Sequence, residues 1–213
     1  MARLGGWTIR EGRGGGSRVS AATWEGPGPA EESLAGAEDA MRALGQTPLV
    51  MVRAGQEALD RALEASGWRV KDPVVTYAGP ASALPAPGLE VAEAWPPGPE
   101  ARAVWAEGGI GPERIAVMDR AAGPKVALGM GGGVAYVALH DGLAMLHALE
   151  VLASARRRGL GRALMGAAGA WAARQGAGQL VLLVTRANAG ANALYAGLGM
   201  AQTGGYHYRE LAP

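Results

Sequence analysis

The sequence contains no cysteine and has only three histidines among its 213 residues. Without cysteine the chain cannot form disulfides, cysteine-ligated zinc sites or thiol nucleophiles. The three histidines are His140, His147 and His207, and they are scattered along the chain. The sequence therefore predicts neither a metal site nor a thiol-based mechanism.

Long apolar runs and an excess of charge of one sign are also lacking. No stretch approaches the roughly 18 consecutive apolar residues of a membrane helix, and Met1–Arg10 lacks the basic, apolar and small-residue order of a secretory signal. Twenty basic residues balance 19 acidic ones, for a net charge of +1. Nucleic-acid-binding proteins usually carry a basic excess. We therefore expect a cytoplasmic protein that binds neither membranes nor nucleic acid.

The sequence is rich in hydrophobic residues and in glycine and proline. Hydrophobic residues make up 49% of the chain and charged residues only 18%, which favours a folded protein with a sizeable core. The 35 glycines and 13 prolines bring the composition close to that of disordered chains. Because hydrophobic periodicity persists along the chain, we expect an ordered α/β protein rather than a disordered one.

Proline and glycine cluster in Tyr77–Gly88, which predicts a linker and a boundary near Pro85. We expect two domains, residues 1–85 and 86–213. Alternating runs joined by Gly131-Gly132 and Asp141-Gly142 predict an antiparallel meander over 125–151, followed by helix, strand, helix and strand. In the first domain we expect strands that include Arg18–Trp24, together with two helices.

The two domains show the same order of predicted elements. Glu31–Tyr77 aligns without a gap with Ala163–Arg209, helix on helix and strand on strand. Identities are few, and any two segments of this kind could align equally well. A true repeat is the hypothesis that we favour, and it predicts two similar units packed against each other.

The segment after the predicted strand Leu143–Val151 has the features of a phosphate-binding loop. Arg156, Arg157 and Arg158 precede Gly159, Leu160 and Gly161, and a helix carrying Arg162 follows. Free amides at a helix N-terminus bind phosphate, and guanidinium groups add bidentate contacts. A solvated basic loop is the simpler alternative. A dinucleotide-binding loop fits less well, because a meander precedes the segment and no GxGxxG is present.

A second pattern lies in Asn188–Met200. Asn188 is a typical N-cap residue, and Tyr195 follows seven residues later on nearly the same helical face, so both side chains can point into one site. The alternative interpretation is a simple cap and a core tyrosine.

Together these motifs resemble those of the GCN5-related N-acetyltransferase (GNAT) superfamily. The acetyl-CoA signature [Q/R]xxGx[G/A] is matched by Arg156–Gly161 after Val151, and the later NxxAxxLY…GF pattern is matched from Asn188 to Gly199, with Met200 replacing the usual aromatic. The resemblance covers 89–213. It implies a GNAT fold, a mixed and mostly antiparallel sheet flanked by helices. The first half, which lacks both motifs, is similar to a smaller, degenerate GNAT-like unit.

The resemblance also implies roles for individual residues. Acetyl-CoA would be the cosubstrate, with its pantetheine arm paired to the backbone of Leu149 and Val151 and contacted by Asn188. Its pyrophosphate would bind the amides of Arg157–Arg162 and the neighbouring arginines. Tyr195 would act as the general acid for the departing thiolate, or at least donate a hydrogen bond to it.

The acceptor amine needs a base, for which His147 is the first candidate. By strand alternation His147 shares a face with Leu149 and Val151, and LHALEV resembles the strand of serotonin-type N-acetyltransferases in which a histidine is the base. A hydrogen-bonded core histidine is the alternative. Glu150 is the other candidate base, although the same alternation turns it to the opposite face.

The predicted function is acetyl transfer from acetyl-CoA to a primary amine of a small or amino-acid-like molecule, by direct attack. The alternatives are a non-catalytic acyl-CoA-binding or regulatory module and, more distantly, a nucleotide-binding redox protein. A homodimer is compatible with the sequence. Several residues could line the acceptor site, with simple packing as the alternative for each: Trp7, Arg18, Trp24, Tyr206, His207 and Tyr208.

Overall fold

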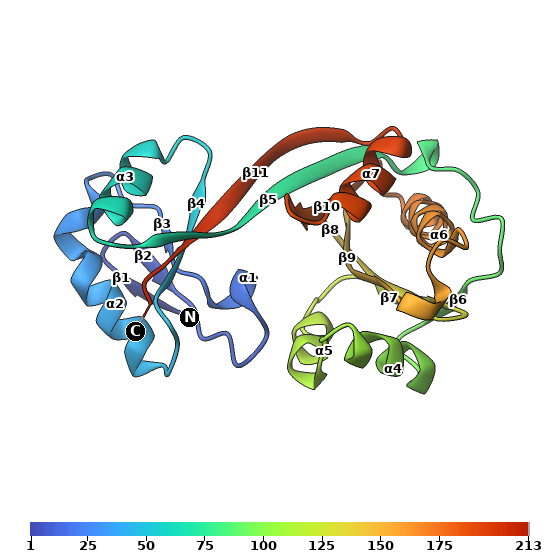
Figure 1. Ribbon diagram of the computed structural model, residues 1–213, viewed down its shortest axis with the longest axis horizontal. Helices are drawn as coiled ribbons and strands as arrows, with labels where there is room; N and C mark the ends of the chain where they lie inside the picture. Colours follow the sequence, from blue (N-terminus) through green and yellow to red (C-terminus); the bar gives the residue numbers. More distant parts are fainter. Residues whose placement is uncertain (213) are drawn as a thin grey trace. The chain divides into compact units, whose positions relative to one another are not determined.

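Figure 1 shows the computed structural model, which describes residues 1–212. The chain forms two compact units, each built from separate segments. Unit 1 comprises Met1–Val75, Thr185–Ala187 and Gly204–Pro213, and unit 2 comprises Thr76–Val184 and Asn188–Thr203. The units are therefore discontinuous, whereas the sequence predicts the continuous segments 1–85 and 86–213.

Unit 1 surrounds a core built by tryptophan and aliphatic side chains. Leu34, Ala37 and Met41 repeat at helical spacing and are the buried residues of α2. They pack in one cluster with Trp7 and Leu63. The elements of this part of the chain are β1 (Ala2–Leu4), β2 (Trp7–Ile9), α1 (Ser17–Ser20), β3 (Thr23–Trp24), α2 (Leu34–Ala43), β4 (Leu49–Arg53) and α3 (Glu57–Ala65).

The strand predicted over Arg18–Trp24 is wrong in its first half. Ser17–Ser20 forms the short helix α1, in which the Ser20 hydroxyl donates to the Gly16 carbonyl at 3.1 Å. Gly16 has a φ of 94°, which lets the chain turn into the helix. Ala21 is extended after the helix, and the strand β3 itself is confined to Thr23–Trp24.

Two long strands, β5 (Arg69–Pro80) and β11 (Ala201–Glu210), contribute residues to both units. The strand order of the larger sheet is β4-β11-β5-β10-β9-β8-β7-β6. Within unit 1, β11 pairs antiparallel with β4 from Tyr206–Arg53 to Glu210–Leu49. A Cβ atom at Gly205 would lie 2.3 Å from the Val74 carbonyl oxygen, so only glycine allows this approach of backbones.

Unit 2 contains the predicted antiparallel meander. Its strands are β6 (Ala92–Ala94), β7 (Lys125–Met130), β8 (Gly133–His140) and β9 (Leu143–Val151), followed by the parallel neighbour β10 (Gln179–Thr185). Asp141 and Gly142 both have positive φ, 47° and 74°, as a two-residue type I′ hairpin requires. The meander prediction is confirmed.

Helices cover the sheet of unit 2 on its two faces (Figure 1). On one face, Val104 and Met118 from the helices α4 (Pro99–Glu107) and α5 (Pro112–Asp119) pack with Val134 and Tyr136 of β8. The helix α6 (Leu160–Arg174) packs against β7, β8 and β9, and α7 (Ala189–Gly197) follows β10.

The segment predicted as a linker packs closely on α6. A Cβ atom at Gly166 would lie 2.3 Å from the Pro85 carbonyl oxygen, and one at Gly169 would lie 2.6 Å from that of Ala81. The small residues of α6 thus admit the backbone of this segment, which explains why Tyr77–Gly88 belongs to unit 2.

Candidate active site

A β-bulge at Ala148 interrupts β9 at the centre of the candidate site. The pairing of β9 with β8 passes from Tyr136–His147 to Val134–Glu150, so β9 advances three residues while β8 advances two. Ala148 has a φ of 51°, and its carbonyl oxygen accepts a 2.8 Å hydrogen bond from the indole Nε1 of the fully buried Trp105. Helix α4 therefore holds the bulge in place.

The bulge overturns the predicted side-chain faces of β9. Directly paired residues of neighbouring strands share a face. Because Tyr136 and Val134 lie on one face of β8, their partners His147 and Glu150 also lie on one face. Val151 pairs with Gly133 and lies on the other face. The prediction that His147 and Val151 share a face is wrong, because the extra residue shifts the alternation by one.

The pairing between β9 and β10 covers only part of their length. It runs from Leu143–Gln179 to Leu146–Leu182, whereas β9 continues to Val151 and β10 continues to Thr185. Beyond Leu146 the β9 edge that faces β10 lies outside this ladder. An extended ligand such as a pantetheine arm could pair there with the backbone of Leu149 and Val151.

The arginine-rich loop, Arg156–Arg162, follows β9 after the short 3-10 turn Ala153–Ala155. Arg157 and Gly159 have the positive φ values 65° and 82°, and α6 begins directly after Gly159. A left-handed residue followed by right-handed ones turns successive N–H groups into one concavity that suits an anion. No side chain caps this helix, so its first amides are available.

The charges of this loop are exposed and largely unpaired. Arg157, Arg158 and Arg162 form no ion pair within residues 1–212, while the Arg156 Nε donates to the Val151 carbonyl at 3.3 Å. A Cβ atom at Gly161 would lie 3.1 Å from the Leu194 Cδ2, so the second glycine of the motif permits close packing of α6 on α7.

Helix α7 carries Asn188 and Tyr195 as predicted, but in different environments. The Asn188 side chain is the N-cap and accepts from the Ala191 amide at 3.0 Å. Tyr195 is 5% exposed, with its ring 5.6 Å from that of Tyr77. The Tyr77 hydroxyl in turn donates to Asn192 at 3.2 Å. Neither Tyr77 nor Asn192 was predicted as a site residue. Asn192 follows Asn188 by four residues, one helical turn, so the spacing alone places the two on one side of the helix.

Glu150 and Tyr195 are electrostatically linked. Burial raises the pKa of Tyr195 to about 12, and the negative charge of Glu150 adds to this rise. Burial also raises the pKa of Glu150, against the opposing effect of Arg156 and Arg114. The site therefore combines a carboxyl group that holds its proton more tightly than usual with a tyrosine that stays protonated at neutral pH.

His147 lies on β9, three residues before Glu150. Its ring centroid is 6.3 Å from that of Tyr136, whose hydroxyl donates to the Met118 carbonyl at 2.8 Å. The register gives His147 the same face as Glu150, so both candidate bases project from the α4 and α5 side of the sheet.

The residues predicted to line the acceptor site have varied surroundings. Trp7 is fully buried, 5.2 Å from the ring of Trp24, and Tyr208 packs against Ala21 and Leu49. These side chains belong to the interior of unit 1. Tyr206 and His207 line a pocket of unit 1 that contains none of the residues assigned to acetyl-CoA.

The described residues offer neither a metal-ligand cluster nor a membrane-spanning helix. Across residues 1–212, histidine, aspartate and glutamate side chains do not gather in threes at any point where a metal ion could bind. In the same part of the chain no helix has the length and apolar character needed to cross a membrane.

Comparison with known proteins identifies a family. The family model of the acetyltransferase (GNAT) family matches residues 91–200, which include the bulge, the arginine-rich loop and Tyr195. A comparison with curated proteins gave no match.

Similar solved structures show the fold. A GCN5-related N-acetyltransferase from Kribbella flavida is 21% identical with a TM-score of 0.68, covering 92% of this chain and 82% of that one. A conserved protein of unknown function from Staphylococcus epidermidis is 10% identical with a TM-score of 0.71, covering 99% and 92%. A GCN5-related N-acetyltransferase from Sphaerobacter thermophilus is 16% identical with a TM-score of 0.69, covering 97% and 76%.

The mixed, mostly antiparallel sheet flanked by helices that the sequence predicts is confirmed. The chain belongs to the acetyltransferase (GNAT) family.

Proposed function

We propose that this protein is an acetyl-CoA-dependent N-acetyltransferase that acetylates a primary amine of a small or amino-acid-like molecule. The observation that carries the proposal is the bulge of β9, which brings His147 and Glu150 to one face of the sheet directly before the exposed arginine-rich loop. The effect of the Glu150 charge on the pKa of Tyr195 supports it. A carboxylate and a phenol can accept and donate the two protons that amide formation moves. The loop offers the amides and guanidinium groups that a pyrophosphate needs.

In the proposed reaction the neutral amine attacks the thioester carbonyl carbon of acetyl-CoA. The new C–N bond forms, the C–S bond breaks, and the amine proton passes to a base. The departing thiolate takes a proton from the Tyr195 hydroxyl. A high pKa keeps Tyr195 protonated until that step. No covalent enzyme intermediate is needed.

Glu150 is our first candidate for the base, and His147 is the second. The raised pKa of Glu150 increases its proton affinity, and its charge acts directly on Tyr195. His147 shares its face and stays in the proposal. Glu150→Gln should remove the acid limb of the pH profile of kcat/KM if Glu150 is the base. His147→Gln should remove it instead if the histidine is the base.

We also propose that the first half of the chain derives from a degenerate GNAT-like unit. The order α2, β4, α3, β5 matches the order α6, β10, α7, β11, which supports a repeat. The first half has neither the arginine-rich loop nor a tyrosine where the repeat would place Tyr195. Acetyl-CoA should therefore bind with a stoichiometry of one per chain.

The catalytic test uses the purified chain with acetyl-CoA and a panel of small amines, and it measures release of the CoA thiol. Tyr195→Phe should slow release about 100-fold while acetyl-CoA binding is retained. Tyr208→Phe removes a buried hydroxyl of unit 1 and should leave turnover unchanged. Binding of acetyl-CoA without amine-dependent thiol release would favour the non-catalytic module.

The cosubstrate test compares two arginines of one helix. Arg162 lies in the first turn of α6, whereas Arg174 lies in its last turn and pairs with Glu93 at 2.5 Å. Arg162→Ala should weaken acetyl-CoA binding about tenfold, and Arg174→Ala should not. Thermal stabilisation by NAD(P) instead of acetyl-CoA would favour the redox alternative.

A further inference from the structure

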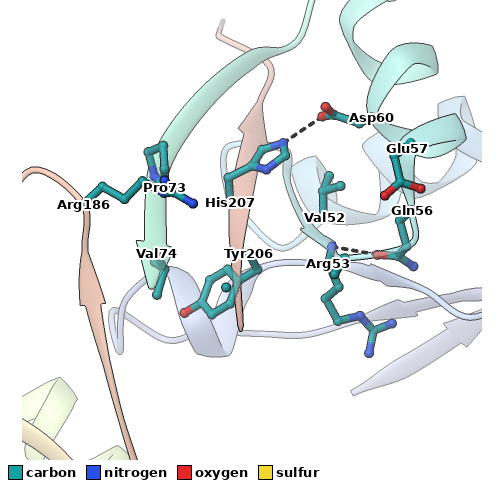
Figure 2. A pocket seen from close by; sticks show the side chains of 12 residues that line it. Val52, Arg53, Gln56, Glu57, Asp60, Pro73, Val74, Arg186, Tyr206 and His207 are labelled. Carbon is teal, nitrogen blue, oxygen red and sulfur yellow. Dashed lines mark hydrogen bonds and ion pairs between the residues drawn. The ribbon is translucent and has the colours of Figure 1, made fainter. Parts of the chain in front are cut away.

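Unit 1 contains a pocket that the proposed acetyl transfer does not involve. Its volume is about 340 Å³, at the lower end of the range for small-molecule sites. The walls come from β4, α3, β5, β11 and the segment Thr185–Ala187. Figure 2 shows His207 at the centre of the view, with side chains of the other elements around it.

One wall of the pocket is a network of charges that satisfy one another. The Asp60 Oδ1 lies 2.7 Å from the His207 Nε2 and accepts a 2.7 Å hydrogen bond from the Arg209 Nε. Arg209 is 5% exposed and also donates to the Trp68 carbonyl at 3.2 Å. Arg209 and His207 together hold the pKa of Asp60 below its usual range. Because these charges already have partners, the network shapes one wall of the pocket and is not available to bind a charged ligand.

Two other charged side chains of the pocket, Arg186 and Glu57, form no ion pair within residues 1–212. Arg186 forms no side-chain hydrogen bond or ion pair within residues 1–212, although its backbone amide donates to the Pro73 carbonyl at 2.7 Å. Glu57 accepts from the Gly55 amide at 3.1 Å and forms no ion pair in the same part of the chain. By contrast, Arg53 of the pocket lies 3.8 Å from Glu25.

These two charges have opposite signs and stand apart. In Figure 2, Arg186 and Glu57 lie on opposite sides of His207. Arg186 directly follows the end of β10, and Glu57 is the first residue of α3. Apolar surface from Val52, Pro73 and Val74 belongs to the same lining. A ligand that matches this arrangement carries a carboxylate at one end, an ammonium group at the other and an apolar spacer between them.

We propose that the pocket of unit 1 binds a small zwitterion whose charges lie at opposite ends, the class that includes ω-amino acids and dipeptides. The ligand carboxylate pairs with the Arg186 guanidinium, and the ammonium group pairs with the Glu57 carboxylate. This binding is independent of acetyl transfer, and no bond is made or broken in it.

The experiment is isothermal titration calorimetry of the full chain with three probes, 4-aminobutanoate, 6-aminohexanoate and dialanine. Butanoate and butylamine, which carry one charge each, are the matched control ligands. At least one zwitterion should bind one per chain with a Kd of about 1 mM, and the single-charge ligands should bind more weakly. Binding should also weaken as salt is added.

Variants of the two charges complete the test. Arg186→Gln and Glu57→Gln should each weaken binding about fivefold, because exposed pairs make modest contributions. Arg61→Gln and Asp39→Asn change exposed charges of unit 1 outside the pocket and should bind normally. The proposal is overturned if no probe binds at about 20 mM, or if Arg186→Gln and Glu57→Gln bind as well as the unmodified chain. Neither result bears on acetyl-CoA turnover, which is measured separately.

Discussion

Trp105 donates its indole N–H to the carbonyl oxygen of Ala148 across 2.8 Å, and so ties α4 to the bulge of β9. The bulge turns His147 and Glu150 to one face of the sheet. The hydrogen bond from Trp105 to the Ala148 carbonyl thus stabilises the bulge, and the bulge sets the direction of the His147 and Glu150 side chains. Trp105 is a positioning residue in this arrangement, since it acts through Ala148.

Trp105→Phe keeps an aromatic ring in the core but removes this hydrogen bond. We expect a loss of about 1–2 kcal/mol in the free energy of unfolding, because the Ala148 carbonyl loses its partner, and a drop of about tenfold in kcat. Urea denaturation and CoA release measure the two effects. Trp95→Phe is the control, because it also keeps an aromatic ring but removes a solvent-exposed hydrogen bond, from the Trp95 indole to Asp119. Equal losses of kcat in both variants would contradict a specific role for Trp105.

The bulge marks the point at which sequence reasoning about the site failed. Strand alternation predicts one face for His147 and Val151, but it assumes an unbroken pleat. Nothing in LHALEV distinguishes a bulged alanine from a regular one, and Trp105 is 43 residues away in the chain. The side of the sheet on which Glu150 lies therefore depends on a long-range contact, which the local hydrophobic pattern cannot predict.

Gly108, at the end of α4, provides the space that Glu150 occupies. A Cβ atom at Gly108 would lie 2.8 Å from the Glu150 Cδ, although the backbone φ of −77° is accessible to any residue. Gly108→Ala should displace the carboxyl group and lower kcat about tenfold with little change in acetyl-CoA affinity. Gly98→Ala, at the start of the same helix, meets nothing within 4 Å and should keep full activity. An unchanged kcat in Gly108→Ala would show that Glu150 can move without consequence.

The arginine-rich loop and the α7 motif were predictable because their information is local. Arg157 and Gly159 turn the chain within one loop, and Asn188 caps the first turn of α7, so each motif acts over a few neighbouring residues. The glycines of the close contacts were not predictable in this way. Gly205 and Gly166 are required by the Val74 and Pro85 carbonyls, which lie far away in the sequence.

Glu150→Gln should make the protein more stable at neutral pH while it slows catalysis. Burial raises the pKa of Glu150 in the folded state, so the folded protein binds the Glu150 proton more tightly than the unfolded chain does. The free energy of unfolding therefore falls as the pH rises and Glu150 loses this proton. Because solvent screens this half-exposed group, we expect a gain in Tm of only about 1–2 °C at pH 8 and almost none at pH 4. Differential scanning calorimetry at both pH values measures it. Glu107→Gln, an exposed change on α4, is the control. A larger gain at pH 4 than at pH 8 would contradict the raised pKa.

Asp60→Asn should destabilise unit 1. Its effect should also be larger at neutral than at acid pH, but with the opposite sign to that of Glu150→Gln. Arg209 and His207 lower the pKa of Asp60, so its charge stabilises the folded state above the unfolded pKa, and that stability is lost as pH falls through the folded pKa. The substitution also leaves the buried Arg209 with Glu64, at 3.5 Å, as its one remaining charged partner within residues 1–212. We expect a loss of about 2 kcal/mol in the free energy of unfolding at pH 7, and a much smaller loss near pH 3. Urea denaturation at the two pH values measures the difference, and Asp39→Asn on α2 is the control for removal of an exposed carboxylate. If the cost of Asp60→Asn were to grow on acidification, the Asp60 charge would not be the source of the stability, and the wall of the unit 1 pocket would depend on packing instead.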